Sequence, residues 1–253
     1  MTQPRVAGPA EAGATLTRPH AWVPGDPGWS GPVVLLLHGT GGDETDLLPL
    51  GRELAPGAPL LAPRGTVLEG TMPRFFRRLR EGVFDEADLT ARAAELARFI
   101  AAAAGEYGFT PGSLVAVGFS NGANIASALL LTHPEAISDA ILIAAMPPFG
   151  VAPPVDLAGH RVLISNGRRD PMAPPPLTSR LVDDLTSRGA TVELLLHPGG
   201  HQLAADHLPA MRAFLKPAAS TGQTGSTGQT GSTEQTGSTE QTGSTEQTGS
   251  TRG

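Results

Sequence analysis

One stretch, Leu114-Val-Ala-Val-Gly-Phe-Ser-Asn-Gly-Ala-Asn-Ile-Ala126, decides the fold of this chain. An apolar run leads into Gly118-Phe-Ser-Asn-Gly122, which we call the elbow, and a small-residue helical pattern follows it. This order predicts a buried strand that turns sharply into a helix and leaves Ser120 at the corner. The motif alone is weak evidence, because 32 of the 253 residues are glycine and a glycine-rich turn is the alternative.

Strand and helix patterns alternate along the rest of the chain. Short apolar runs predict buried strands at 32–37, 60–62, 114–118, 140–144, 161–165 and 191–196, and an early strand is expected within 15–23. Apolar residues three or four apart predict helices at about 45–54, 86–104, 121–133, 177–188 and 203–215. This alternation predicts an α/β fold, with a mostly parallel sheet and helices on both of its faces.

Two local features complete this prediction. Asp43 is expected to cap the helix that starts near Thr45. Residues 67–84 show no clean period, and we expect them to form a long surface excursion between a strand and a helix.

Composition divides the chain into three parts. Residues 1–14 are rich in Pro, Gly and Ala and are predicted to be a flexible N-terminus. Residues 15–216 have the length and apolar content of one α/β domain. Within 217–253, a six-residue unit without hydrophobic residues repeats from Ser220 onward, so we expect a disordered tail.

Charge and cysteine content exclude several classes of function. The net charge of −6 gives no case for nucleic acid, and the absence of cysteine excludes disulfides, thiolate chemistry and Cys-ligated metals. The sequence shows neither a signal peptide nor an apolar stretch long enough to cross a membrane, so a cytoplasmic location is expected. We expect no metal, no cofactor, and no nucleic-acid or membrane partner. The expected partner is a small-molecule substrate, and the sequence leaves open whether the protein forms a homodimer.

Two further residues follow strands in positions that suit catalysis with Ser120. A serine hydroxyl needs a base, and the base needs an orienting acid. Asp170 follows the strand that ends near residue 165, and His201 follows the last strand. Because the carboxyl ends of parallel strands meet at one edge of a sheet, we predict a catalytic triad of Ser120, Asp170 and His201. His197 is the alternative base, placed before the loop Gly199-Gly200.

A serine nucleophile also requires backbone donors for the oxyanion of its tetrahedral intermediate. We predict the N–H of Asn121, the residue after the nucleophile, and an N–H of the glycine-rich loop 38–42. In that loop Thr40 is preferred and Gly41 is the alternative. His38 is expected to pack within the loop and not to act as a second base.

Candidates for the substrate pocket come from apolar and basic residues near the predicted strand ends. Met146, Phe75, Phe76 and Met172 could line an apolar acyl or aryl pocket, with core or lid packing as the alternative. Four arginines could receive a substrate carboxylate or phosphate, although a solvated basic face is the preferred interpretation. They are Arg64, Arg74, Arg77 and Arg78.

Four motifs together resemble the phospholipase/carboxylesterase family of small α/β-hydrolases. They are Leu37-His-Gly-Thr-Gly-Gly-Asp-Glu44, Gly118-Phe-Ser-Asn-Gly-Ala123, Gly167-Arg-Arg-Asp-Pro171 and Gly199-Gly-His-Gln202. The resemblance covers roughly residues 15–215, and residues 72–78 and 81–85 look like the bacterial branch associated with hydroquinone compounds and ring-cleaving dioxygenases. It implies an α/β-hydrolase fold, the triad already predicted, and an oxyanion hole of Thr40 and Asn121.

The resemblance also implies an activity. It suggests a serine carboxylesterase that needs no cofactor and hydrolyses small soluble acyl or aryl esters, with an acyl thioesterase or a lysophospholipase as alternatives. Thioesterase members usually carry Gln where this chain has Asn121, and related bacterial sequences often carry Arg before the methionine that matches Met146, where Ala144 and Ala145 stand here. The non-enzymatic alternative is a hydrolase-derived module that binds a small ligand.

Overall fold

The computed structural model describes residues 5–7, 16, 18–110 and 112–216. The predicted tail 217–253 lies outside the described residues, as does the predicted flexible N-terminus except for residues 5–7. Those three residues form a short strand that pairs with the early strand, at Arg5 with Trp22 and at Ala7 with His20. A three-residue strand is too short to show a period in the sequence.

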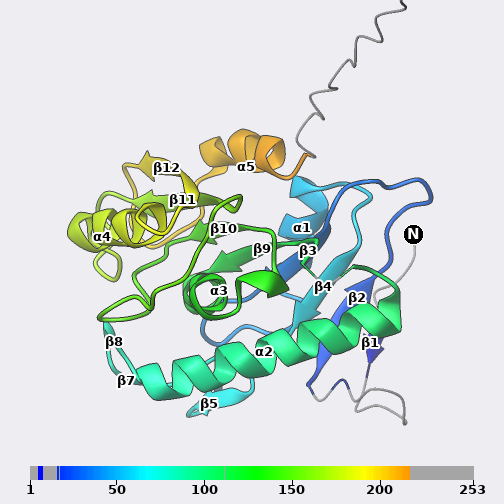
Figure 1. The fold of residues 1–253 in the computed structure, drawn as a ribbon, viewed down its shortest axis with the longest axis horizontal. Coiled ribbons are helices and arrows are strands. Elements are labelled where there is room, and N and C mark those ends of the chain that lie inside the picture. Colours follow the sequence, from blue (N-terminus) through cyan, green and yellow to red (C-terminus); the bar gives the residue numbers. More distant parts are fainter. Residues whose placement is uncertain (1–4, 8–15, 17, 111, 217–253) are drawn as a thin grey trace, which may run out of the picture. The chain divides into compact units, whose positions relative to one another are not determined.

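An eight-stranded sheet lies at the centre of the described residues (Figure 1). Its strand order is β1-β2-β4-β3-β9-β10-β11-β12. The strands from β4 to β12 in this order run parallel, while β1 and β2 pair antiparallel at one edge. This arrangement confirms the mostly parallel sheet. The strands are β1 (Arg5–Ala7), β2 (His20–Val23), β3 (Val33–Leu37), β4 (Leu60–Pro63), β9 (Leu114–Phe119), β10 (Asp139–Ile143), β11 (Arg161–Gly167) and β12 (Thr191–His197).

Helices cover both faces of this sheet, as predicted (Figure 1). Side chains of β3 alternate between two apolar clusters: Leu35 belongs to the cluster that includes residues of α2, α3 and α4, whereas Leu36 belongs to the cluster that includes residues of α1 and α5. This alternation is the two-residue period of a strand buried on both faces. No helix in the described ranges is both long and apolar enough to cross a membrane. The helical segments are α1 (Leu48–Leu54), α2 (Glu86–Tyr107), α3 (Asn121–Thr132), η1 (Pro134–Ala136), α4 (Pro175–Thr186), η2 (Ala205–His207) and α5 (Leu208–Phe214).

The start of α1 differs from its prediction. The helix begins at Leu48, and the residue at its N-cap, Leu47, makes no side-chain capping bond. Asp43 instead accepts hydrogen bonds at 2.7 Å from both the N–H and the hydroxyl of Thr45. The predicted Asp43 cap was therefore wrong, because the aspartate stabilises a turn that precedes the helix.

The excursion between β4 and α2 contains more regular structure than predicted. It forms two antiparallel hairpins, β5 (Val67–Glu69) with β6 (Met72–Arg74) and β7 (Arg78–Arg80) with β8 (Val83–Phe84). Between the hairpins the chain dips into the core, where Phe75 and Phe76 are 2% and 0% exposed. Strands of two or three residues are too short for a recognisable period, which explains why sequence analysis missed them.

Candidate active site

The elbow holds Ser120 in strained backbone geometry between β9 and α3. Ser120 has φ 52° and ψ −112°, a region that costs a non-glycine residue about 1–3 kcal/mol. A Cβ at Gly122 would lie closer than 3.0 Å to the carbonyl oxygen of Leu37, and one at Gly118 equally close to the carbonyl oxygen of Gly122. The two glycines of the motif thus allow α3 to start directly against the ends of β3 and β9.

Three side chains form a hydrogen-bonded row at this corner. Ser120 Oγ lies 2.8 Å from His201 Nε2, and His201 Nδ1 lies 2.8 Å from Asp170 Oδ2. A carboxylate only accepts, so Nδ1 carries the imidazole proton and Nε2 accepts from the serine hydroxyl. Asp170 is 1% exposed, and its other oxygen accepts from the N–H groups of Met172 and Ala173. This row has the geometry of a base that is oriented by an acid.

The acid and the base come from the loops that follow two neighbouring strands, β11 and β12. These strands are paired up to Gly167 and His197, and beyond them the N–H of Arg169 donates to the carbonyl of Gly199 at 3.0 Å. A Cβ at Gly167 would collide with the Gly200 carbonyl. The close packing of the two loops places Asp170 beside His201.

His197, the alternative base, makes different contacts. Its Nδ1 accepts from the N–H of Gly199 at 3.1 Å, and its ring packs edge-on against His207 at 5.5 Å between centroids. Its Nε2 is buried and has no hydrogen-bond partner among the described residues. The structure therefore joins His201, and not His197, to Ser120.

The candidate oxyanion donors differ in whether their N–H groups are already hydrogen-bonded. The N–H of Gly41 donates to the carbonyl of Pro73 at 2.9 Å, so the alternative donor is already occupied and that prediction was wrong. Within the described part of the chain, the N–H groups of Thr40 and Asn121 have no acceptor. Both residues line the same pocket as Ser120 and His201.

This pocket lies at the elbow, whose residues Ser120 and Asn121 form part of its lining. Met146 and Met172 line it, as predicted, whereas the buried Phe75 and Phe76 do not. Phe84, another phenylalanine of the excursion, supplies the aromatic wall from the second hairpin. The complete lining is Thr40, Arg74, Arg78, Glu81, Gly82, Phe84, Ser120, Asn121, Asn124, Ala144, Met146, Met172, Ala173 and His201.

Two asparagines in the first turn of α3 hold the pocket walls. Asn121 Oδ1 accepts from the N–H of Phe75 at 2.7 Å, and Asn124 Oδ1 accepts from the N–H of Met146 at 3.0 Å. Asn124 was not predicted from the sequence, although an asparagine on a largely apolar buried helix was a signal for it. Ala144 has φ 55° without being glycine, a further strained position at the edge of the site.

The expected solvated basic face is present only in part: the side chain of Arg77 is 62% exposed and that of Arg64 is 38% exposed. Arg74 is only 3% exposed: its Nη1 donates to Thr40 Oγ1 at 2.7 Å and lies 3.2 Å from Glu69. Burial lowers the pKa of this guanidinium, the charge of Arg78 lowers it further, and Glu69 offsets part of the effect. The other three arginines also pair with carboxylates: Arg64 with Glu44, Arg77 with Asp85, and Arg78 with Glu69 and Glu81.

His38 packs within its loop, as expected. Its ring is 1% exposed, Nδ1 donates to the carbonyl of Gly39 at 2.6 Å, and Nε2 accepts from the N–H of Gly65 at 3.0 Å. Burial lowers the pKa of this imidazole, and the Gly39 carbonyl and nearby carboxylates oppose the effect only in part. Both ring nitrogens are used, so His38 is not available as a base.

Comparison with known proteins identifies the family. No family model matches the chain. It is 47% identical over 192 residues to "Putative hydrolase MhqD" of Bacillus subtilis (strain 168), covering 76% of this chain and 96% of that protein.

Solved structures agree with this relationship. A carboxylesterase from Bacillus cereus superposes with a TM-score of 0.74 at 42% identity, covering 77% of this chain and 91% of that one. A carboxylesterase from Mesorhizobium loti superposes with a TM-score of 0.73 at 34% identity, covering 78% and 94%. The chain belongs to the phospholipase/carboxylesterase family of α/β-hydrolases.

Proposed function

We propose that this protein is a serine carboxylesterase that hydrolyses small soluble acyl or aryl esters. The observation that carries the proposal is the row from Ser120 through His201 to Asp170, with 2.8 Å at each step, at the edge of a pocket. The similarity to two bacterial carboxylesterases supports the same class of reaction.

The reaction would proceed through an acyl-enzyme. His201 Nε2 takes the hydroxyl proton as Ser120 Oγ attacks the ester carbonyl carbon, and Asp170 stabilises the imidazolium that forms. The tetrahedral intermediate collapses when the C–O bond to the alcohol breaks and His201 returns the proton to the leaving oxygen. Water, deprotonated by His201, then attacks the acyl-enzyme and releases the acid and free Ser120.

The N–H groups of Thr40 and Asn121 are the proposed oxyanion donors. They have no acceptor among the described residues and line the pocket that Ser120 also lines. The loss of one such donor typically lowers kcat by about 10²–10³-fold.

The walls of the pocket suit acyl or aryl groups. Phe84, Met146 and Met172 supply apolar surface there. A neighbouring hollow shares Phe84 and Met146, which gives room for one further group of the substrate.

A panel of p-nitrophenyl esters tests the proposal, alongside acyl-CoA thioesters and lysophospholipids. We expect turnover of short-chain and aryl esters, covalent labelling by a fluorophosphonate, and loss of both in a folded Ser120→Ala variant. Preferred turnover of acyl-CoA or lysophospholipid would change the substrate class. Absence of turnover and labelling in the wild type, together with binding of an aromatic ligand, would replace the enzyme with a binding module.

A further inference from the structure

The segment 73–77, which we call the brace, contacts both loops that carry the proposed oxyanion donors. Three consecutive residues make one bond each. The carbonyl of Pro73 accepts from the N–H of Gly41 at 2.9 Å, and Arg74 Nη1 donates to Thr40 Oγ1 at 2.7 Å. The N–H of Phe75 donates to Asn121 Oδ1 at 2.7 Å. The two donor residues, 81 positions apart in sequence, are thus tied to one short piece of chain.

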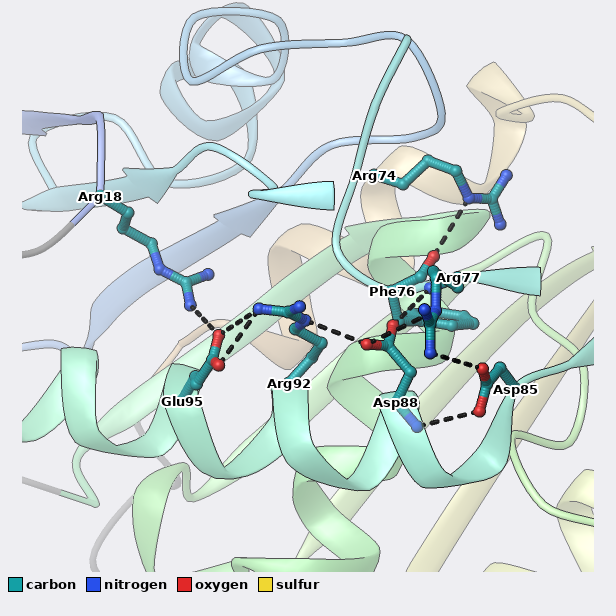
Figure 2. A network of polar contacts seen from close by, with 8 residues as sticks. All are labelled: Arg18, Arg74, Phe76, Arg77, Asp85, Asp88, Arg92 and Glu95. Atoms are coloured by element: carbon teal, nitrogen blue, oxygen red, sulfur yellow. Dashed lines mark hydrogen bonds and ion pairs between the residues drawn. The ribbon is translucent and has the colours of Figure 1, made fainter. Parts of the chain in front are cut away.

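The far end of the brace is anchored on α2 (Figure 2). The N–H of Arg77 donates to Asp88 Oδ2 at 2.7 Å, and the side chain of Arg77 reaches Asp85 at 2.9 Å. Asp88 is itself held, because Arg92 Nε donates to its Oδ1 at 3.3 Å. A continuous series of polar contacts therefore runs from the first turns of α2 into the brace.

Arg74 links the anchored end to the active site. Figure 2 shows its Nε directed at the carbonyl of Phe76, a bond of 3.2 Å, and its Nη1 bonds Thr40. A guanidinium presents its donors in a rigid fork, so the two bonds together fix the Thr40 hydroxyl relative to the brace. The guanidinium also lies 5.9 Å from the ring centroid of Phe76, and Glu69 balances its charge. A buried cation requires such partners, so its position is tightly determined.

We propose that Arg74 is a positioning residue for the oxyanion hole, holding the N–H of Thr40 in place through the Thr40 hydroxyl. This inference rests on the proposed esterase function. Oxyanion donors act only when they are preorganised about 2.7–3.1 Å from the developing charge. A displacement of about 1 Å can lower the rate roughly 10²-fold.

Direct binding of substrate by Arg74 is the alternative, because Arg74 also lines the pocket. Its Nε bonds Phe76, and its Nη1 bonds Thr40 and lies 3.2 Å from Glu69, which leaves Nη2 without a partner among the described residues. A positioning role and a binding role differ in measurable ways. The first lowers kcat and weakens transition-state analogues, whereas the second raises KM.

The test uses the full chain with Arg74→Gln and Thr40→Val, singly and together. Thr40→Val removes the hydroxyl that Arg74 contacts but keeps the backbone N–H. We expect each single variant to lower kcat on a p-nitrophenyl ester by about 10- to 100-fold, with KM within about twofold of wild type. The double variant should be no slower than the slower single variant, because both changes break the same link. Affinity for a boronic acid, which forms a tetrahedral adduct with Ser120, should fall in parallel with kcat.

Arg80→Gln is the matched control, since Arg80 is an exposed arginine of the neighbouring β7 and should leave kcat unchanged. Wild-type kcat in Arg74→Gln, a loss confined to KM, or additive effects in the double variant would overturn the inference. If Arg74→Gln does not fold, the Thr40→Val variant alone tests the inference. Wild-type kcat in Thr40→Val would then overturn the inference. An inactive wild type that fluorophosphonate does not label would instead refute the proposed esterase.

Discussion

The elbow contains one proposed oxyanion donor, Asn121, and the brace contacts both donor residues, but the two regions are held in opposite ways. The elbow depends on the absence of atoms: α3 starts where it does because Gly118 and Gly122 have no side chain to collide with the backbone. The brace depends on the presence of partners, since Arg74 and Arg77 are held by hydrogen bonds and opposite charges. A substitution that adds atoms should therefore disrupt the elbow, whereas a substitution that removes a hydrogen-bond acceptor should make the brace less rigid.

This difference predicts contrasting responses to the same substitution on two helices. Gly122→Ala should destabilise the protein by more than about 3 kcal/mol or prevent its folding, because the new Cβ meets the backbone carbonyls of Leu37 and His38. Gly105→Ala, in the exposed part of α2, adds a Cβ that meets no other segment of the described chain within 4 Å, so it should instead stabilise the protein by about 0.4–1 kcal/mol. Urea unfolding of both variants measures the contrast. Equal effects would mean that the elbow relaxes around a side chain.

The same difference explains what could be predicted from the sequence. The elbow was predictable because glycines at a strand–helix boundary follow from local sterics. The meeting of Ser120, Asp170 and His201 was predicted because side chains at the carboxyl ends of parallel strands converge. Their hydrogen bonds are a structural observation, and their catalytic roles remain a proposal.

The brace was not predictable for a physical reason. The strands of the two hairpins that flank it are two or three residues long, so no period identifies them, and an arginine-rich run normally indicates a solvated face. Arg74 is buried only because its partners, Thr40 and Glu69, are brought to it by the tertiary fold. The burial of Phe75 and Phe76 likewise depends on contacts with distant elements, among them Asn121.

Loss of the anchor on α2 should have an intermediate effect. Asp88→Ala removes the acceptor of the Arg77 N–H and the partner of Arg92, so we expect the free energy of unfolding to fall by about 1–2 kcal/mol. Ester turnover should fall less than in Arg74→Gln, because Asp88 acts on the far end of the brace. Thermal unfolding and kcat should be measured beside Glu106→Ala, an exposed acidic position on the same helix, where the change should stay within about 0.5 kcal/mol. If the Asp88→Ala variant kept wild-type stability and kcat, the contact between α2 and the brace would not support the active site.

His38 lies between the two regions and should make stability depend on pH. Its Nε2 accepts from the N–H of Gly65, its ring lies 4.7 Å from that of Phe75, and its carbonyl faces the position where a Cβ of Gly122 would be. Burial lowers the pKa of His38 in the folded state, in spite of Asp43, Glu44 and Asp46 nearby. A protonated ring would lose the bond from Gly65, because Nε2 could no longer accept.

The sign of the effect follows from proton binding. Below the ordinary histidine pKa of about 6.5, the unfolded chain binds a proton at His38 that the folded protein excludes until the pH reaches the lowered value. Stability from this group is therefore complete above about pH 6.5 and falls on acidification, by at most about 1.4 kcal/mol per pH unit. His38→Gln retains a donor and an acceptor but does not titrate, so its unfolding free energy should decline less between pH 7.5 and 5.5. His207, whose pKa is lowered by burial and by His197, is present in both proteins, so its contribution cancels. Parallel stability curves from urea unfolding would show that protonation of His38 is not coupled to folding.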